Sequence, residues 1–109
     1  MSRTSRTQVT VPASAKKNSI IEIRAIVQHD MESGFRYTES GKLIPRDIIR
    51  VFSCSYNDVE VFKADFYPGI GANPLVIFTT TATESGTLVF KWFGDEGYAA
   101  VNQARITVV

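Results

Sequence analysis

The chain has 109 residues, of which 44% are hydrophobic and 11% aromatic, so it is long enough for one domain with a modest core and is not a disordered chain. Its formal net charge of +1 combines four basic residues in positions 1–18 with a mildly acidic remainder. That remainder has no basic stripe, and no apolar run approaches the roughly 20 residues that cross a bilayer, so we expect neither a nucleic-acid nor a membrane partner.

Residues 1–18 differ in composition from the rest of the chain. They contain four basic residues, no acidic residue and several Ser and Thr residues. Such a segment buries little apolar surface, so we predict a disordered basic leader followed by a folded domain over residues 19–109. The basic residues are not followed by the apolar core of a secretory signal peptide, so the sequence taken alone predicts a cytoplasmic location.

The first strand is predicted over residues 20–28. Ile21, Ile23, Ala25 and Val27 alternate there with mostly polar residues. This period of two is typical of a β-strand that buries one face against a core. We therefore expect the folded domain to begin with a half-buried strand.

A long polar connection, residues 29–45, follows this strand. Connections of this length in a small domain usually serve a ligand or a partner. We predict a recognition loop in which His29, Met31, Glu32 and Arg36 contact a partner. His29 could instead be a loop anchor or a proton-transfer group, since the residues alone leave these roles open.

The remaining strands are predicted from turn residues and from β-branched and aromatic content. They cover residues 47–56, 59–66, 75–81, 87–93 and 98–108, and residues 35–38 can add a short seventh strand. Asn57-Asp58 suits a tight hairpin turn, and the Pro and Gly residues of Tyr67 to Asn73 suit a crossing between sheets. Six or seven mostly antiparallel strands without a convincing helix predict an all-β fold, an immunoglobulin-like β-sandwich.

Both phases of these later strands carry apolar residues. The phase expected in the core holds Phe52, Cys54, Phe62, Ala64, Phe66, Leu88, Phe90 and Trp92. The opposite phase holds Ile49, Val51, Val59, Val61, Val89 and Phe93. A solvated sandwich face normally alternates to polar residues, so this second set predicts a partner-binding outer face. The alternatives are isolated exposed apolar residues or an inverted strand phase.

Few residues could support catalysis. The chain has one His and one Cys, so an activated thiol would need Cys54 paired with His29. Cys54 is in phase with Phe52 and Tyr56 on an apolar strand face, which favours a small buried hydrophobic residue over a reactive thiol. The usual zinc and copper ligand sets cannot be assembled from one His and one Cys, so we expect no metal and no cofactor.

Short motifs occur in order along residues 20–109. They are Met31-Glu32, Gly34, Gly41-Lys42, Ile44-Pro45, Tyr56-Asn57-Asp58, Ala64-Asp65-Phe66, Asn73-Pro74-Leu75, Phe90-Lys91-Trp92 and Gly94-Asp95-Glu96-Gly97. In this order and spacing they resemble the SoxZ family, the Z subunit of the sulfur carrier complex of thiosulfate oxidation. Asp30, Asp58 and Phe66-Tyr67 depart from the family pattern, which has Pro, a turn Gly and Trp-Gly at these places.

The resemblance implies an immunoglobulin-like, non-catalytic subunit. It implies a SoxY-type partner, in a heterodimer or heterotetramer, that holds sulfur intermediates on its C-terminal cysteine, and transient contacts with other enzymes of thiosulfate oxidation. It also implies a periplasmic location, reached by export together with a partner that bears the signal. Two alternatives remain open, namely a sulfur-transfer enzyme that uses Cys54 and a self-associating β-sandwich module.

Overall fold

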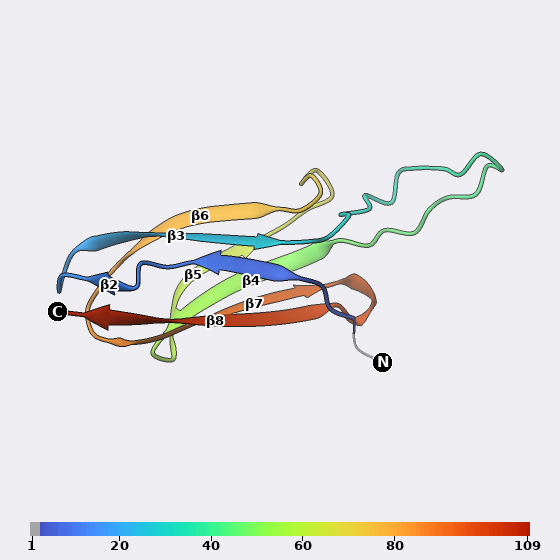
Figure 1. The fold of residues 1–109 in the computed structure, drawn as a ribbon. Helices are drawn as coiled ribbons and strands as arrows, with labels where there is room; N and C mark the ends of the chain where they lie inside the picture. The colour runs from blue at the N-terminus through green and yellow to red at the C-terminus, as the bar shows by residue number, and fades with distance from the viewer. Residues whose placement is uncertain (1–2) are drawn as a thin grey trace.

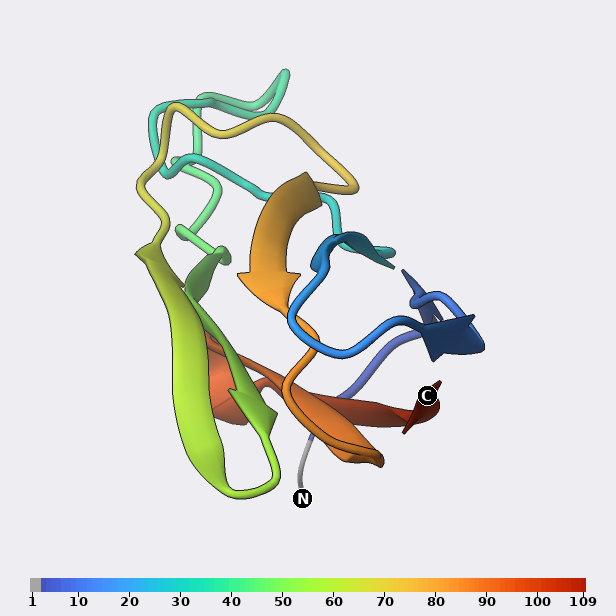
Figure 2. The same cartoon turned by 90° about the vertical axis from the view of Figure 1, so that its left-hand side faces the viewer.

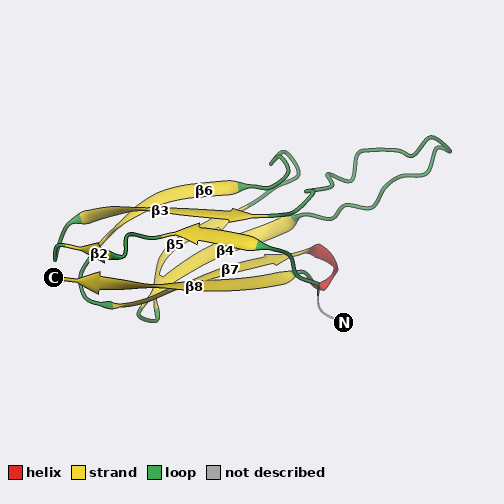
Figure 3. Ribbon diagram, viewed as in Figure 1, coloured by secondary structure: helices red, strands yellow, loops and turns green. Residues whose placement is uncertain are grey.

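Two β-sheets pack face to face in the computed structural model, which describes residues 3–109 (Figure 1). Most of the strands are joined by short turns, as the colouring by secondary structure shows (Figure 3). The elements are β1 (Thr7–Thr10), β2 (Ser14–Ala15), β3 (Ile20–Val27), β4 (Ile49–Tyr56), β5 (Val59–Asp65), β6 (Leu75–Thr81), β7 (Gly86–Gly94), the 3-10 turn η1 (Asp95–Gly97) and β8 (Ala99–Val108).

The strand order confirms the predicted immunoglobulin-like sandwich. One sheet has the order β1-β3-β6 and the other has the order β2-β8-β7-β4-β5. All of these neighbours are antiparallel except β2 and β8, which run parallel. The end-on view shows the two layers with the hairpin of β4 and β5 at one side (Figure 2).

The core lies between the sheets and follows the predicted alternation. In β3, the side chains of Ile21, Ile23, Ala25 and Val27 are buried while their neighbours lie outward. The facing sheet contributes a row of fully buried side chains, which are Phe52, Cys54, Leu88, Phe90 and Trp92. Burial of large apolar side chains of this kind is the main driving force for the fold.

Two predicted connections are confirmed. Asn57 and Asp58 have φ values of 48° and 68°, the left-handed conformation that a tight hairpin turn requires and that Asn and Asp tolerate. The Asn57 side chain also accepts a hydrogen bond from the backbone N–H of Thr87 at 3.0 Å. Residues 66–74 carry the chain from β5 in one sheet to β6 in the other, which is the predicted crossing.

The predicted disordered leader is wrong where the structure describes it. Residues 1 and 2 lie outside the described residues, but β1 pairs with β3 and β2 pairs with β8. Val9 pairs with Ala25 and packs against the core. A four-residue strand with one inward valine is too short a signal to stand out in a basic, hydroxyl-rich segment.

The fold contains no helix, among residues 3–109, that is long and apolar enough to cross a membrane.

Candidate partner-binding arm

The most unusual feature of the sandwich is a hairpin that projects from one end of it. Residues 33–46, called the arm here, form the outer part of the connection between β3 and β4 and extend well beyond the sheets (Figures 1 and 3). Tyr37 pairs with Leu43 across the hairpin, and the backbone N–H of Thr38 donates to the carbonyl of Lys42 at 2.8 Å. The principal dimensions of the molecule, 60 × 26 × 18 Å, reflect this projection.

Three large apolar side chains of the arm are exposed. Phe35 is 78% exposed, Tyr37 65% and Leu43 52%. Cross-strand partners share one face of a hairpin, and so do residues two positions apart, which places all three on one face. Exposed aromatic side chains on a protruding element are the usual anchors of a protein–protein interface.

These three residues were not among the predicted contacts. The available signal was the alternation of Phe35 and Tyr37 with polar neighbours in an otherwise polar loop, which the prediction used only for a possible short strand. Cross-strand pairing of Tyr37 with Leu43 brings the third apolar residue to the same face.

Two of the predicted contacts anchor the base of the arm instead. His29 and Met31 are 7% and 5% exposed, so neither is available to a partner, and the prediction of direct contact is wrong for both. The backbone N–H of Met31 donates to His29 Nδ1 at 2.9 Å, and the N–H of Ile49 lies 3.3 Å from Met31 Sδ. Met31 thus joins the entry of the arm to the first residue of β4.

The buried imidazole of His29 faces a salt bridge. Its Nδ1 accepts a hydrogen bond, so the proton of the neutral ring is on Nε2, which has no hydrogen-bond partner and lies 3.7 Å from Asp47 Oδ1. Arg3 holds that carboxylate with two hydrogen bonds of 2.9 and 2.7 Å. Tyr98 packs edge-on against the ring with centroids 4.9 Å apart. Burial lowers the pKa of His29, although Asp47 acts in the opposite direction.

Backbone pairing and ion pairs stiffen the same region. Glu32 and Asp47 exchange two backbone hydrogen bonds of 2.9 Å, which close the hairpin at its base. Arg36 reaches back to Glu32 with an ion pair of 2.5 Å, and its hydrogen bond lowers the pKa of that carboxyl group. Arg46 binds Asp95 through two hydrogen bonds of 2.9 Å. The arm therefore leaves the sandwich in a defined direction.

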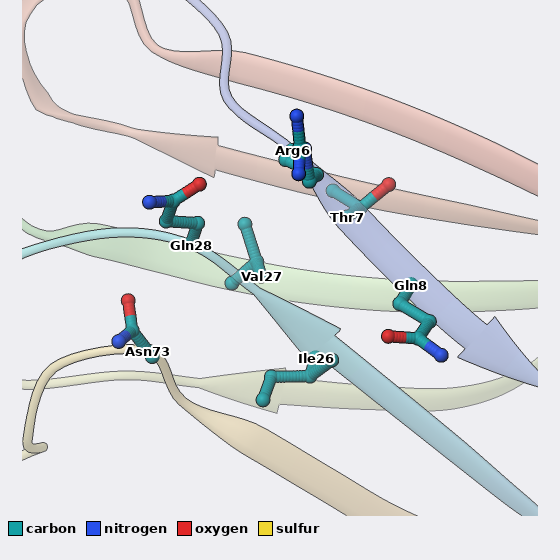
Figure 4. A pocket seen from close by; sticks show the side chains of 7 residues that line it. All are labelled: Arg6, Thr7, Gln8, Ile26, Val27, Gln28 and Asn73. Carbon is teal, nitrogen blue, oxygen red and sulfur yellow. The ribbon is translucent and has the colours of Figure 1, made fainter.

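A shallow pocket of about 390 Å³ lies beside the base of the arm (Figure 4). Its lining consists of Arg6, Thr7, Gln8, Ile26, Val27, Gln28 and Asn73. Asn73 ties the 66–74 connection to this end of β3, because its backbone N–H donates to the carbonyl of His29 at 2.7 Å and its Oδ1 accepts from the His29 N–H at 3.0 Å. The side-chain amides of this pocket lie near the apolar residues Ile26 and Val27, and together they extend the surface next to the arm.

Three of the six residues predicted for a partner-binding outer face lie in the outward phase of the five-stranded sheet. Val51 pairs with Phe93 in the phase opposite to the core residues Phe52 and Trp92, and Phe93 is 45% exposed. Val89 lies in the same outward phase on β7. Lys91 and two β4 serines share this face, so its apolar residues form a strip within a mixed surface.

Of the other three predicted outer residues, Ile49 and Val61 pack toward the core instead, because β4 and its neighbours shift register twice. Ile49 is fully buried, beyond a shift between Ile49 and Val51. A second shift, between Cys54 and Ser55, packs Val61 against the core, while Val59, the first residue of β5, pairs with Tyr56 and stays 65% exposed. A single extra residue in a strand moves every following side chain to the other face.

Cys54 is a buried core residue, as predicted. Its side chain is fully enclosed, and burial raises the pKa of the thiol to about 12. The thiolate is the reactive form, so this residue is inert near neutral pH. Within residues 3–109, no three side chains of His, Cys, Asp or Glu lie together in an arrangement that could hold a metal ion.

Comparisons with known proteins place the chain in context. Residues 9–105 match the family model of the sulphur oxidation protein SoxZ. No curated protein matches the chain. Among solved structures, the superoxide reductase (neelaredoxin) of Ignicoccus hospitalis is similar, with a TM-score of 0.73, 20% identity, and coverage of 94% of this chain and 80% of that one.

Two further solved structures share the fold. The sulfur carrier protein SoxY of Chlorobium limicola f thiosulfatophilum has a TM-score of 0.67 and 13% identity, with 98% of this chain and 83% of that chain covered. A superoxide reductase-like protein of Thermotoga maritima has a TM-score of 0.75 and 15% identity, with coverage of 99% and 94%. At these identities the likeness concerns the fold.

Proposed function

Because this chain belongs to the SoxZ family of sulphur oxidation proteins, we propose that it is the non-catalytic subunit of a sulfur carrier complex. Its companion is a SoxY-type subunit that holds sulfur intermediates on a cysteine of its own, in a heterodimer or a heterotetramer. The chain stabilises that companion and helps present the bound intermediate to the other enzymes of thiosulfate oxidation, which it contacts only transiently.

The main support for this proposal is the exposed apolar surface of the arm. The arm exposes Phe35, Tyr37 and Leu43 on a firmly anchored hairpin. These side chains add no stability to the isolated domain, because their apolar surface stays in water. Two aromatic side chains and a leucine on one face form a suitable cluster for the centre of an interface. Of the predicted contacts, Glu32 and Arg36 lie at the base of the arm, where they form an ion pair with each other.

The outer strip is a second proposed contact. Val51, Val89 and Phe93 are the predicted outer residues that do lie on the outward side of the five-stranded sheet. Val101 extends the strip, since it pairs with Lys91 of β7 and is 62% exposed. This surface suits a contact of mixed apolar and charged character, typical of transient complexes.

The non-catalytic role is supported by the state of the single cysteine. A sulfur-transfer enzyme needs a thiolate that a donor can reach, whereas Cys54 is buried and its pKa is raised to about 12. The covalent chemistry therefore belongs to the companion. We further propose a periplasmic location, reached by export together with the companion, which supplies the signal.

Co-purification with a SoxY-type subunit tests the proposal. With an affinity tag on the companion alone, this chain should co-elute in a stable stoichiometric complex. The Cys54→Ala variant should form the same complex and leave sulfur loading of the companion unchanged. Separate elution of the two chains would refute the pairing, and loss of sulfur loading in an intact Cys54→Ala complex would refute the non-catalytic role.

A further inference from the structure

The outer edge of β6 has no strand partner among residues 3–109. β6 has β3 as its single strand neighbour in the three-stranded sheet of residues 3–109. An edge strand presents a row of unpaired backbone N–H and C=O groups, which another chain can pair with. Proteins usually protect such edges with short strands, charged side chains or bulges, so each edge of this fold can be compared with that rule.

The edges formed by β1, β2 and β5 follow the rule. β1 and β2 have four and two residues, and β1 lies against the other sheet, where Asn102 Nδ2 donates to Thr7 Oγ1 at 3.0 Å. β5 carries Glu60, Lys63 and Asp65, and its pairing with β4 contains a register shift. The charged side chains and the register shift both disfavour the pairing of a further strand with β5.

β6 has none of these protections. It spans seven residues, Leu-Val-Ile-Phe-Thr-Thr-Thr, without a charge, a proline or a register shift in its pairing with β3. Its outward side chains Leu75 and Ile77 are 51% and 50% exposed, and Ile26 of β3 pairs with Leu75. An added strand would complete the edge and cover these side chains.

The same side of the sandwich leads to the arm. β6 starts where the 66–74 connection ends, and both views show that connection beside the arm at the same end of the molecule (Figures 1 and 2). Asn73 and His29 join the two segments through backbone hydrogen bonding at 2.7 Å. A strand that ran along β6 would therefore end near the base of the arm.

We propose that the SoxY-type subunit adds a β-strand to the free edge of β6, so that the three-stranded sheet continues into the companion. This inference rests on the proposed pairing. The companion is the favoured occupant because the SoxY structure from Chlorobium limicola shares this sandwich fold, and such a fold supplies edge strands. Main-chain hydrogen bonds then give affinity, while the arm gives specificity through its three apolar side chains.

Amide hydrogen exchange on the intact complex tests this inference directly. In the free chain, the β6 amides that point away from β3 should exchange quickly. In the complex, exchange at residues 75–81 should slow at least tenfold, while the β5 edge at residues 59–65 should be unaffected and serves as the internal control.

A pair of variants separates this inference from the pairing itself. Ile77→Lys places a charge beside the β6 edge and should weaken the complex at least tenfold, whereas Val59→Lys, at a 65% exposed site on β5, should not. A complex that forms with β6 exchange unchanged would overturn strand addition and leave the pairing standing. Absence of any complex would overturn both, and protection of β6 in the chain alone would assign the edge to a second copy and overturn the inference.

Discussion

At the scale of single residues, His29 links protonation to the base of the arm. Neutral His29 accepts the N–H of Met31 at Nδ1, and a proton on that nitrogen would abolish the acceptor. Burial acts in the same direction and lowers the pKa of His29 below its usual value, although Asp47, Asp30 and Asp95 raise it, and Arg3 lowers it further. The folded protein therefore binds this proton less readily than the unfolded chain.

The sign of the pH dependence follows from this difference. Above the unfolded pKa of about 6.5, His29 is neutral in both states and its contribution to stability is complete. As the pH falls toward the folded pKa, the free energy of unfolding should decrease, with a slope of at most about 1.4 kcal/mol per pH unit. Denaturant unfolding between pH 8 and pH 5 measures this slope.

A His29→Asn variant is the matched control. Asn can accept the Met31 N–H through its carbonyl oxygen but cannot gain a proton in this range. The variant should therefore lose the part of the pH dependence that comes from His29 and keep the part that comes from carboxylates. Identical slopes in the two proteins would mean that His29 does not titrate differently on folding.

At the scale of elements, Gly34 fixes the direction in which the arm leaves the sandwich. Gly34 has a φ of +87°, and a Cβ atom there would lie 2.9 Å from Cβ of Arg46, on the returning strand of the arm. Gly34→Ala should therefore destabilise the protein by about 1–2 kcal/mol, because both the left-handed backbone and the close approach oppose a side chain. Thermal unfolding measures the loss.

Gly69→Ala provides the comparison. Its added Cβ would meet no atom within 4 Å, and its φ is outside the left-handed range. This variant should keep the wild-type melting temperature or raise it slightly, because alanine restricts the unfolded chain. Equal melting temperatures for the two variants would show that the base of the arm accepts a side chain at position 34 without loss of stability.

Elements with a strong local signal could be predicted from the sequence. The alternation in β3 and the Asn57-Asp58 turn are set by neighbours in the chain, so both were identified correctly. Val61 could not be assigned to the right face, because the register shift between Cys54 and Ser55 depends on packing between strands. The apolar face of the arm likewise requires the cross-strand pairing of Tyr37 with Leu43.

At the scale of the whole molecule, the sandwich could be predicted from the sequence, but the contact of its N-terminal segment with the base of the arm could not. Arg3 was assigned to a disordered leader, yet it clamps Asp47 at the base of the arm. The two partners are 44 positions apart, so no local pattern reveals the contact. The N-terminal segment therefore contacts both sheets and the base of the arm, and it holds these parts of the molecule together.

The affinity of a Tyr37→Ala variant for the SoxY-type subunit tests the central claim, that the arm binds the companion. Loss of an aromatic anchor at an interface costs about 2 kcal/mol, so Kd should rise about 30-fold. Val59→Ala is the control, because Val59 has the same 65% exposure as Tyr37 but lies outside the proposed contacts. Calorimetric titration should show weakened binding for Tyr37→Ala alone, and wild-type affinity in a folded Tyr37→Ala protein would contradict the role of the arm.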